Sequence, residues 1–433
     1  MIPIFRISLD PLIGLKRGDL MHNDQNILYI CHSYNSFQKD PIEESSKYLN
    51  NVNVLVRTNP IAEIANYFPV HRLDRYKQKS KIDLNSLPEN ISVFPTPIIY
   101  APLDSQYKKL GELHYRAVEK LIQKNHMKFD LIHSHFTWSA GYAGARLKEK
   151  YNVPFVVTAH GYDIYSLPFK DDEWKNKIEY VLNTADHIIT VSRINLAFIK
   201  MLNISTPVTV IPNGFRNDLF YPQNSRDCRK ELNLPQDKKI ILTVGNLESV
   251  KNHTDLVEAA HRIILERKDI ICVIVGYGKL YSALKHQIHS LGLDDYIILT
   301  GGKPHNKIPL WMNACDQFVL PSLNEGNPTV MFEALGCGKP FIGTSVGGVP
   351  EVISSEQYGL LVEPANTKDL ADKILIALDH DWDRELILEY AEQFRWENIT
   401  KNIIKVYQNL DILHDKQYDT QANNSEIKRL QNQ

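Results

Sequence analysis

Short apolar runs rich in β-branched residues alternate along the chain with longer stretches in which apolar residues recur every three to four positions. The short runs predict buried strands, and the longer stretches predict amphipathic helices. Strands are expected at Ile27–Cys31, Val52–Val56, Leu131–His133, Phe155–Thr158, His187–Val191 and Val208–Ile211, and then at Ile240–Val244, Ile270–Val275, Ile297–Thr300, Gln317–Leu320, Phe341–Gly343 and Gly359–Val362. Because strands that alternate with helices form parallel sheets covered by helices, these two sets predict an α/β protein with two sheets.

A break in the pattern separates the two sets of strands. Between Ile211 and Phe215, a proline and an Asn-Gly pair interrupt the apolar periodicity, and such residues mark turns and linkers. We place the domain boundary there. The expected domains are an N-terminal domain over residues 26–213 and a C-terminal domain over residues 214–395.

The two ends of the chain differ from its middle. From Trp382 to Leu410 the apolar spacing is purely helical, which predicts a helical end to the folded part of the chain. Residues 413–433 are polar and are expected to be disordered. Residues 1–25 are interpreted as an N-terminal extension, with Met21 as the expected native start because a strand-like run begins shortly after it.

The composition of the chain argues against several classes of protein. The 433 residues are 43% hydrophobic and 23% charged, which predicts a folded protein of two or three domains. The net charge of −2 argues against a nucleic-acid partner. The five cysteines are scattered, without metal spacing, and predict buried thiols in a reducing, cytoplasmic compartment. No apolar run approaches the roughly 18 residues of a membrane-spanning helix.

The most informative segment runs from Leu320 to Pro340. A buried strand leads into a glycine-containing loop, and Pro328 fits the first position of the helix that follows. A helix N-terminus at the carboxyl end of a parallel strand binds anions and polar hydroxyls. Glu325 in the loop and Glu333 in the helix could contact one ligand at different depths, and carboxylates accept paired hydroxyl hydrogen bonds. An isolated pair of glutamates at this spacing is more often a solvated helix residue and a loop charge, so the neighbouring loops decide between the two interpretations.

Three further glycine-bearing loops follow strands of the same half. These are GNLESVKN from Gly245, VGYGK from Val275 and GTSVGGVPE from Gly343. Because the carboxyl ends of parallel strands meet at one edge of a sheet, the four loops are expected to converge. A structural role alone does not account for that convergence.

Here the sequence resembles a known family. The run EGNPTVMFEALGCGKP with GGVPE, the loops GNLESVKN and VGYGK, and IPNGF together resemble the family 4 (group 1) retaining glycosyltransferases of the GT-B fold, over roughly residues 25–412. The resemblance implies two Rossmann-like, doubly wound parallel-sheet domains facing a cleft. It also implies a nucleotide sugar held mainly by the C-terminal domain, and a last helix, about residues 396–412, that crosses back onto the first domain.

The resemblance assigns roles to residues of the C-terminal half. Glu333 is expected to bind the donor ribose, Glu325 the hydroxyls of the transferred sugar, and Lys251 the diphosphate. The implied donor-binding residues are Gly245, Asn246, Lys251, Gly276, Gly326, Asn327, Pro328, Thr329, Val330 and Glu333. Asn246 stands where the family usually has an arginine, which removes one expected phosphate contact.

In the N-terminal half, two segments resemble the histidine-bearing loops of the family. They run from Asp130 to His135 and from Val157 to Asp163. By resemblance His160 approaches the transferring sugar and, with Glu325 and Lys251, forms the catalytic set, while His135 and Asp163 lie on the acceptor side. The loop after the first strand, residues 32–38, lacks the glycines usual in the family, so acceptor contacts there do not transfer.

The implied activity is transfer of a hexose-type sugar from a nucleotide-diphosphate sugar to a glycan or polyprenyl-linked acceptor, with retention and without metal. The D-x-D string at Asp381–Asp383 opens a late helix rather than following a strand, so no metal role and no cofactor are expected. Two other functions stay open. One is a nucleotide-sugar epimerase or phosphorylase, and the other is an inactive sugar-nucleotide-binding subunit.

The distribution of charge along the chain indicates what kind of acceptor the protein could bind. Residues 1–213 contain 25 Lys and Arg against 21 Asp and Glu, so the acceptor-side half is basic. Within it, residues 72–81 form a basic, aromatic-bearing segment. This segment could be a solvated loop, or it could contact an anionic membrane or a polyprenyl-diphosphate acceptor. The second interpretation would place the protein peripherally at the inner face of the membrane.

Overall fold

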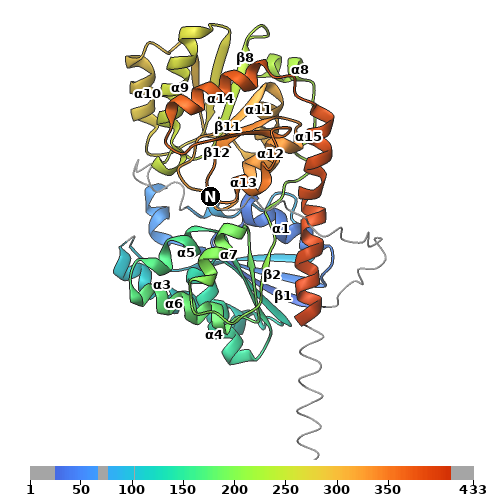
Figure 1. Cartoon of the computed structure of the whole chain (residues 1–433). Helices are drawn as coiled ribbons and strands as arrows, with labels where there is room; N and C mark the ends of the chain where they lie inside the picture. The colour runs from blue at the N-terminus through green and yellow to red at the C-terminus, as the bar shows by residue number, and fades with distance from the viewer. Residues whose placement is uncertain (1–24, 67–76, 102, 411–433) are drawn as a thin grey trace, which may run out of the picture. The chain divides into compact units, whose positions relative to one another are not determined.

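The computed structural model describes residues 25–66, 77–101 and 103–410 (Figure 1). The expectations for the N-terminal extension and the disordered tail fall outside these residues. The chain divides into two compact units. Of the described residues, the first unit takes those up to 191, 195–211 and 397–410, and the second unit takes 192–194 and 212–396.

The first unit contains a parallel sheet of seven strands in the order β3-β2-β1-β4-β5-β6-β7. The strands are β1 (Asn26–Cys31), β2 (Asn51–Thr58), β3 (Ile91–Pro97), β4 (Leu131–His135), β5 (Phe155–Ala159), β6 (His187–Thr190) and β7 (Val208–Val210). The order reverses direction at β1, as in doubly wound sheets. Strands β4 and β5 are buried along their whole length. The mostly apolar sequence of β5 fits this burial, whereas β4 also buries three polar residues, His133, Ser134 and His135.

Sequence analysis missed strand β3. Pro95 and Pro97 interrupt its apolar pattern, and proline cannot donate to a sheet ladder. The structure places β3 at the edge of the sheet, where it pairs with β2 alone. One side of an edge strand needs no partner, so the prolines are tolerated there.

Helices cover the sheet of the first unit (Figure 1). They are α1 (Ser36–Ser46), α2 (Gln78–Lys81), α3 (Asp104–Asn125), α4 (Tyr142–Tyr151), α5 (Tyr162–Tyr165), α6 (Asp172–Thr184) and α7 (Arg193–Lys200). Trp138 and Trp174 are the largest buried side chains of the core.

The predicted helical stretch after Trp382 is interrupted. Helix α15 (Arg384–Ala391) and the 3-10 turn η7 (Glu392–Phe394) are followed by a separate helix over residues 396–410. At the break, the backbone pairs with Phe215, whose N–H donates to the carbonyl of Phe394 and whose carbonyl accepts from Trp396. This pairing replaces helical hydrogen bonds, and apolar periodicity alone does not reveal it.

The last helix belongs to the first unit. Its Tyr407 is fully buried and shares a hydroxyl–hydroxyl hydrogen bond of 2.8 Å with Tyr29 of β1. A second hydrogen bond of 2.6 Å joins the Tyr407 hydroxyl to Nδ1 of His133. Burial raises the pKa of Tyr407 well above its ordinary value, so the phenol stays neutral.

The second unit contains a parallel sheet of six strands in the order β10-β9-β8-β11-β12-β13. They are β8 (Lys239–Val244), β9 (Ile270–Val275), β10 (Ile297–Gly301), β11 (Gln317–Leu320), β12 (Phe341–Thr344) and β13 (Gly359–Val362). The helices are α8 (Ser225–Glu231), α9 (His253–Glu266), α10 (Tyr281–Ser290), α11 (Ile308–Ala314), α12 (Thr329–Gly336), α13 (Val349–Val352), α14 (Thr367–Asp379) and α15.

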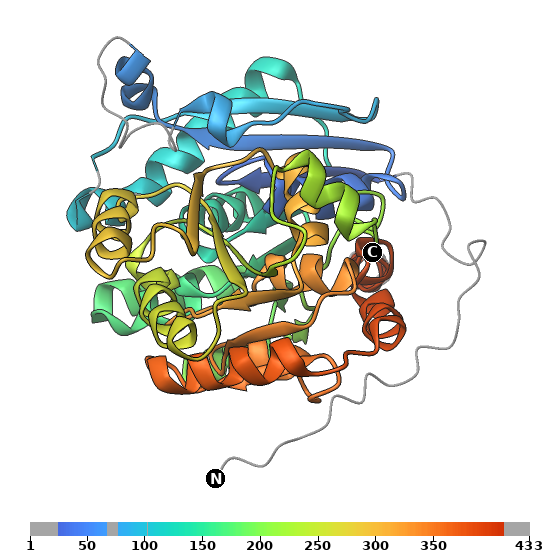
Figure 2. The same cartoon turned by 90° about the horizontal axis from the view of Figure 1, so that it is seen from above.

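Separate apolar clusters cover the two faces of this sheet. One cluster includes Met331 and Phe332 of α12, and the other includes Leu256 of α9 and Ile374 of α14. Figure 2 shows α14 in orange-red alongside the orange strands of its own sheet. Helices therefore cover both faces of the sheet, as its apolar strands predict.

The four glycine-bearing loops follow β8, β9, β11 and β12, which are adjacent in the sheet. Their predicted convergence at one edge is confirmed. One detail differs from the prediction, because α12 begins at Thr329 and Pro328 is its N-cap with extended backbone, ψ 121°. Gly338 ends the helix with φ +69°, a conformation that glycine adopts without strain.

None of the helices in the described ranges combines the length and the apolar character that crossing a membrane requires.

Candidate functional site

The centre of the converging loops is an ion pair between Lys251 and Glu325. Lys251 ends the 3-10 turn η5 (Ser249–Lys251) after β8, and Glu325 lies in the loop after β11. Nζ of Lys251 lies 2.6 Å from Oε1 of Glu325, and the Ser322 hydroxyl donates to the same oxygen at 2.6 Å. The Glu325 side chain is 9% exposed and that of Lys251 is 23% exposed. The ion pair is therefore largely shielded from water, and the Ser322 hydroxyl adds a second hydrogen bond to the carboxylate.

A backbone hydrogen bond joins the two loops that carry this ion pair. The N–H of Leu323 donates to the carbonyl of Val250 at 2.8 Å. The position of each charged side chain therefore depends on the other loop. Sequence analysis named both ion-pair partners but did not predict that they pair, and it did not identify Ser322.

Glu333 occupies a second buried position, in helix α12, where it is 6% exposed. Its Oε1 lies 2.9 Å from Nε2 of His305, in the 3-10 turn η6 (His305–Lys307) that follows β10. His305 was missed by sequence analysis. A histidine after a strand of the same sheet is the signal that could have indicated it, as it did in the N-terminal half.

Asn327 lies between Glu325 and Glu333 in the sequence and binds the loop to Asn213. Its Oδ1 accepts from the N–H of Asn213 at 2.8 Å, and its carbonyl accepts from the Asn213 side chain at 2.6 Å. The neighbouring Gly326 accepts from the N–H of Gly348 at 2.8 Å. The Asn327 side chain is thus structural, whereas the first-turn N–H groups of α12, at Thr329 and Val330, have no helical carbonyl to bond.

Gly245 and Gly276 allow two of the loops to touch. The N–H of Gly245 donates to the carbonyl of Val275 at 3.0 Å. A side chain at Gly276 would collide with the Gly245 carbonyl. Asn246, between Gly245 and Leu247, is exposed, so the residue that departs from the family pattern lies at the surface of this loop.

Gly347 is expected to be intolerant of substitution. It has φ +53°, and a Cβ there would collide with the carbonyl of Glu325. Gly347→Ala should lower the free energy of unfolding by about 1–3 kcal/mol more than Gly292→Ala does. Gly292 is the matched control, because it has a similar φ of +65° and open space around it. Urea denaturation of the two variants measures the difference, and equal losses would contradict the collision.

In the first unit, His135 ends strand β4, and His160 follows β5. Nδ1 of His135 lies 3.0 Å from Nε2 of His160, and the two rings stack with centroids 5.2 Å apart. Nδ1 of His160 is buried and has no hydrogen-bond partner among the described residues. Sequence analysis named both histidines but not their contact.

Burial lowers the pKa of His135 to about 3, and it lowers the pKa of His160 well below its ordinary value. Both rings are therefore neutral near pH 7, and only one proton lies between them. If His135 donates to His160, the proton of His160 is at Nδ1, which can then donate to a ligand. In the opposite tautomer, Nδ1 accepts instead.

Asp163 holds the loop that carries His160. One carboxylate oxygen accepts from the N–H groups of His160 and Gly161, at 3.1 and 2.9 Å, and the other accepts from the N–H of Thr137 at 2.8 Å. Burial raises the pKa of Asp163, although these N–H donors oppose the shift. The structure therefore places Asp163 against the backbone of its own loops.

The D-x-D string lies apart from these groups. Asp383 is the N-cap of α15, and its carboxylate accepts from the N–H of Leu386 at 3.0 Å. A capping role accounts for this aspartate without a ligand.

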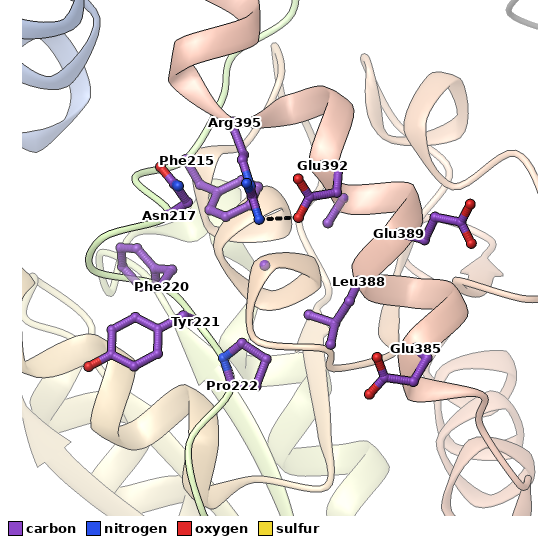
Figure 3. Close-up of a pocket in the computed structure, with 12 residues that line it drawn as sticks. Phe215, Asn217, Phe220, Tyr221, Pro222, Glu385, Leu388, Glu389, Glu392 and Arg395 are labelled. Carbon is purple, nitrogen blue, oxygen red and sulfur yellow. Dashed lines mark hydrogen bonds and ion pairs between the residues drawn. The ribbon is translucent and has the colours of Figure 1, made fainter.

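A pocket of about 520 Å³ in the second unit lies elsewhere. Figure 3 shows it between the chain from Phe215 to Pro222 and helix α15, with Arg395 extended toward Glu392. The predicted donor-binding residues do not line it. The candidate site is therefore the loop cluster, not this pocket.

Comparisons with known proteins agree with these loops. The family described as glycosyl transferases group 1 matches residues 224–394, and glycosyltransferase family 4 matches residues 75–218. An uncharacterized glycosyltransferase of Methanocaldococcus jannaschii is 30% identical over 319 residues, which are 70% of this chain and 83% of that protein. The chain belongs to the group 1 glycosyltransferases.

Solved structures share the fold of this glycosyltransferase. Sucrose-phosphate synthase from Thermosynechococcus elongatus aligns with a TM-score of 0.71 and 20% identity, covering 90% of this chain and all of that one. HepE of Anabaena, solved in complex with UDP-glucose, aligns with a TM-score of 0.68 and 21% identity, covering 89% and 100%. With the two parallel sheets, these likenesses confirm the GT-B fold.

Proposed function

We propose that this glycosyltransferase moves a hexose-type sugar from a nucleotide-diphosphate sugar to a glycan or polyprenyl-linked acceptor, with retention of anomeric configuration and without a metal ion. The observation that carries the proposal is the Lys251–Glu325 pair, set among the four glycine-bearing loops and beside the N-terminus of α12. The crystallised UDP-glucose complex of HepE supports the donor class.

Glycosyl transfer develops negative charge on the departing diphosphate. In the proposed mechanism, the Lys251 ammonium and the first-turn N–H groups of α12 stabilise that charge from fixed positions. Glu325 holds Lys251 in place and accepts hydroxyl hydrogen bonds of the transferred sugar. The cation and the helix N-terminus together supply charge stabilisation that a metal would otherwise provide, which is why metal independence is proposed.

Glu333 is proposed to bind the donor ribose. Its contact with His305 orients one carboxylate oxygen. A carboxylate accepts two adjacent hydroxyl groups with favourable geometry.

His160 is proposed to contact the transferred sugar through Nδ1, the ring nitrogen that has no partner among the described residues. His135 fixes the orientation of the His160 ring, and Asp163 fixes its backbone. Because both imidazoles are neutral, the contact is a hydrogen bond to a hydroxyl group rather than an ion pair.

The test is a thermal-shift screen of the whole chain against UDP-, GDP- and ADP-sugars, followed by a nucleotide-release assay with the donor that binds. We expect one base class to raise the melting temperature and nucleotide release to depend on an added acceptor. NMR of the product should show the anomeric configuration of the donor, and EDTA should leave the rate unchanged. Formation of a sugar 1-phosphate or a C2 epimer would instead identify a phosphorylase or an epimerase.

A further inference from the structure

The first unit contains two buried cations that lie next to each other. Arg57, near the end of β2, is 7% exposed, and Lys81, at the end of α2, is 8% exposed. Nζ of Lys81 donates to the carbonyl of Arg57 at 3.0 Å. The sequence leaves two interpretations of residues 72–81 open, a solvated loop or a contact with an anionic membrane or polyprenyl-diphosphate acceptor. The first is wrong for Lys77 and Lys81, which are both buried. Residues 72–76 of that loop lie outside the described residues.

Neutral groups surround the two cations. Nη1 of Arg57 donates to the Ser139 hydroxyl at 2.8 Å, and that hydroxyl also contacts Nδ1 of His114 at 2.9 Å. Arg57 lies over the ring of Tyr100, 5.4 Å from its centroid. Thr96 is the strand partner of Arg57 in β3. These contacts use only part of the guanidinium, because its Nε–H is buried without a partner among the described residues.

Several other buried polar atoms near Arg57 also lack partners in the described part of the chain. They are Nε2 of His114, which is fully buried, Nε2 of His32 and Oγ1 of Thr96. Buried polar atoms are nearly always hydrogen-bonded in native proteins. The Nε–H of Arg57 is a donor, and the imidazole nitrogens and the hydroxyl are able to donate as well, so an acceptor placed among them would satisfy these atoms.

Within the described residues, neither Arg57 nor Lys81 forms an ion pair with a carboxylate. Burial, and then repulsion from Arg57, lower the pKa of Lys81 to about 7. Burial also lowers the pKa values of His32 and His114, and the positive charges of Arg57 and Lys81 lower them further. Asp163, a buried carboxylate of the same unit, accepts hydrogen bonds from backbone N–H groups with both of its oxygens.

Unpaired buried charge is costly, so a fold keeps it where a ligand supplies the opposite charge. The position fits this explanation. Arg57, Ser139 and Tyr100 each come at or just after the carboxyl end of a strand of one parallel sheet. That edge is where open α/β sheets bind ligands.

We propose that Arg57 and Lys81 form an oxyanion subsite that binds a phosphate or carboxylate group of the acceptor. The acceptor is accordingly an anionic molecule. The proposal rests on the proposed function, in which the first unit takes the acceptor. The guanidinium supplies a planar, fixed pair of donors, and the ammonium supplies a second charge.

The test measures binding of simple anions to the full chain by thermal shift, with the donor site occupied by whichever of UDP, GDP and ADP stabilises the chain. One arm uses inorganic phosphate, a second uses acetate, and a third uses sodium chloride at matched ionic strength. We expect phosphate or acetate to raise the melting temperature by about 2 °C or more over the chloride arm. The arm with the larger shift identifies the anionic group.

Lys81→Met should abolish that shift, and Lys79→Met should keep it. Lys79 is the matched control, because it lies in the same helix, carries the same charge and is exposed. Without anions, Lys81→Met should melt at or above the wild-type temperature, since it removes an unpaired buried charge. Arg57→Gln provides the second variant.

Two results would overturn the subsite. One is an unchanged anion response in both Lys81→Met and Arg57→Gln, and the other is a melting temperature of Lys81→Met far below that of the wild type. The stabilisation by the nucleoside diphosphate alone is read separately. If none of UDP, GDP and ADP stabilises the wild type, the result counts against the proposed function, whereas stabilisation without any anion response counts against the subsite only.

Discussion

Lys251→Ala should lower kcat/KM for the donor by about 100- to 1,000-fold, the usual cost of removing one fixed group that stabilises developing charge. The loss should appear mainly in kcat, because the charge on the diphosphate grows as the glycosidic bond breaks. Initial rates of nucleotide release at varied donor concentration measure both constants.

Lys285→Ala is the control for Lys251→Ala. Lys285 is exposed on α10 and belongs to the same unit, so its loss removes one positive charge without touching the loop cluster. Its kcat/KM should match that of the wild type. Activity of Lys251→Ala within a few-fold of this control would show that the leaving group is stabilised elsewhere.

Glu325→Gln should lower kcat/KM by about 10- to 100-fold, as expected for the loss of a hydrogen bond to a charged group. The glutamine keeps the size of the side chain and can still accept from the Ser322 hydroxyl. It no longer attracts Lys251, whose ammonium lies 2.6 Å from the carboxylate. Both the sugar contact and the position of the cation should therefore weaken.

The double variant tests whether the two residues act as a unit. If Glu325 acts partly by holding Lys251, then Glu325→Gln combined with Lys251→Ala should lose less than the two single losses together predict. Glu356→Gln, at an exposed position of the same unit, is the control for the change of charge. Additive losses would show that each residue contacts the substrate independently.

Strands with continuous apolar sequence were predictable, because burial on both faces leaves an unmistakable pattern. Strand β3 was not, since Pro95 and Pro97 are acceptable only on a strand that lacks one neighbour. Whether a strand lies at the edge of a sheet depends on the order of all its strands and cannot be predicted from the sequence of that strand alone. The same holds for the break at residues 392–395, which Phe215 stabilises from far away in the sequence.

The residues of the candidate site also fall into two groups, those that the sequence predicts and those that only the folded structure reveals. Lys251, Glu325 and the two histidines could be named because each lies at or after the end of a strand in a segment of recognisable composition. Glu333 could be named because it lies in the helix that follows the loop of Glu325, within the run that resembles the family. Their partners could not. Ser322 lies in the same loop as Glu325, three residues before it, and only the folded loop brings its hydroxyl to the carboxylate. His305 meets Glu333 because the strands that precede them belong to one sheet. Arg57 was missed entirely, because an arginine in an apolar strand gives no sequence signal of what surrounds it.

The buried Tyr407 has a consequence for how the chain is made. Its hydroxyl completes a hydrogen bond with Tyr29, which is 378 residues earlier. At about 5–20 residues per second, a ribosome needs roughly 20–75 s to cover that distance. The whole second unit emerges in this interval, so it can finish folding while the first unit still lacks its last helix. The part of the protein that is translated first is thus the last to be completed.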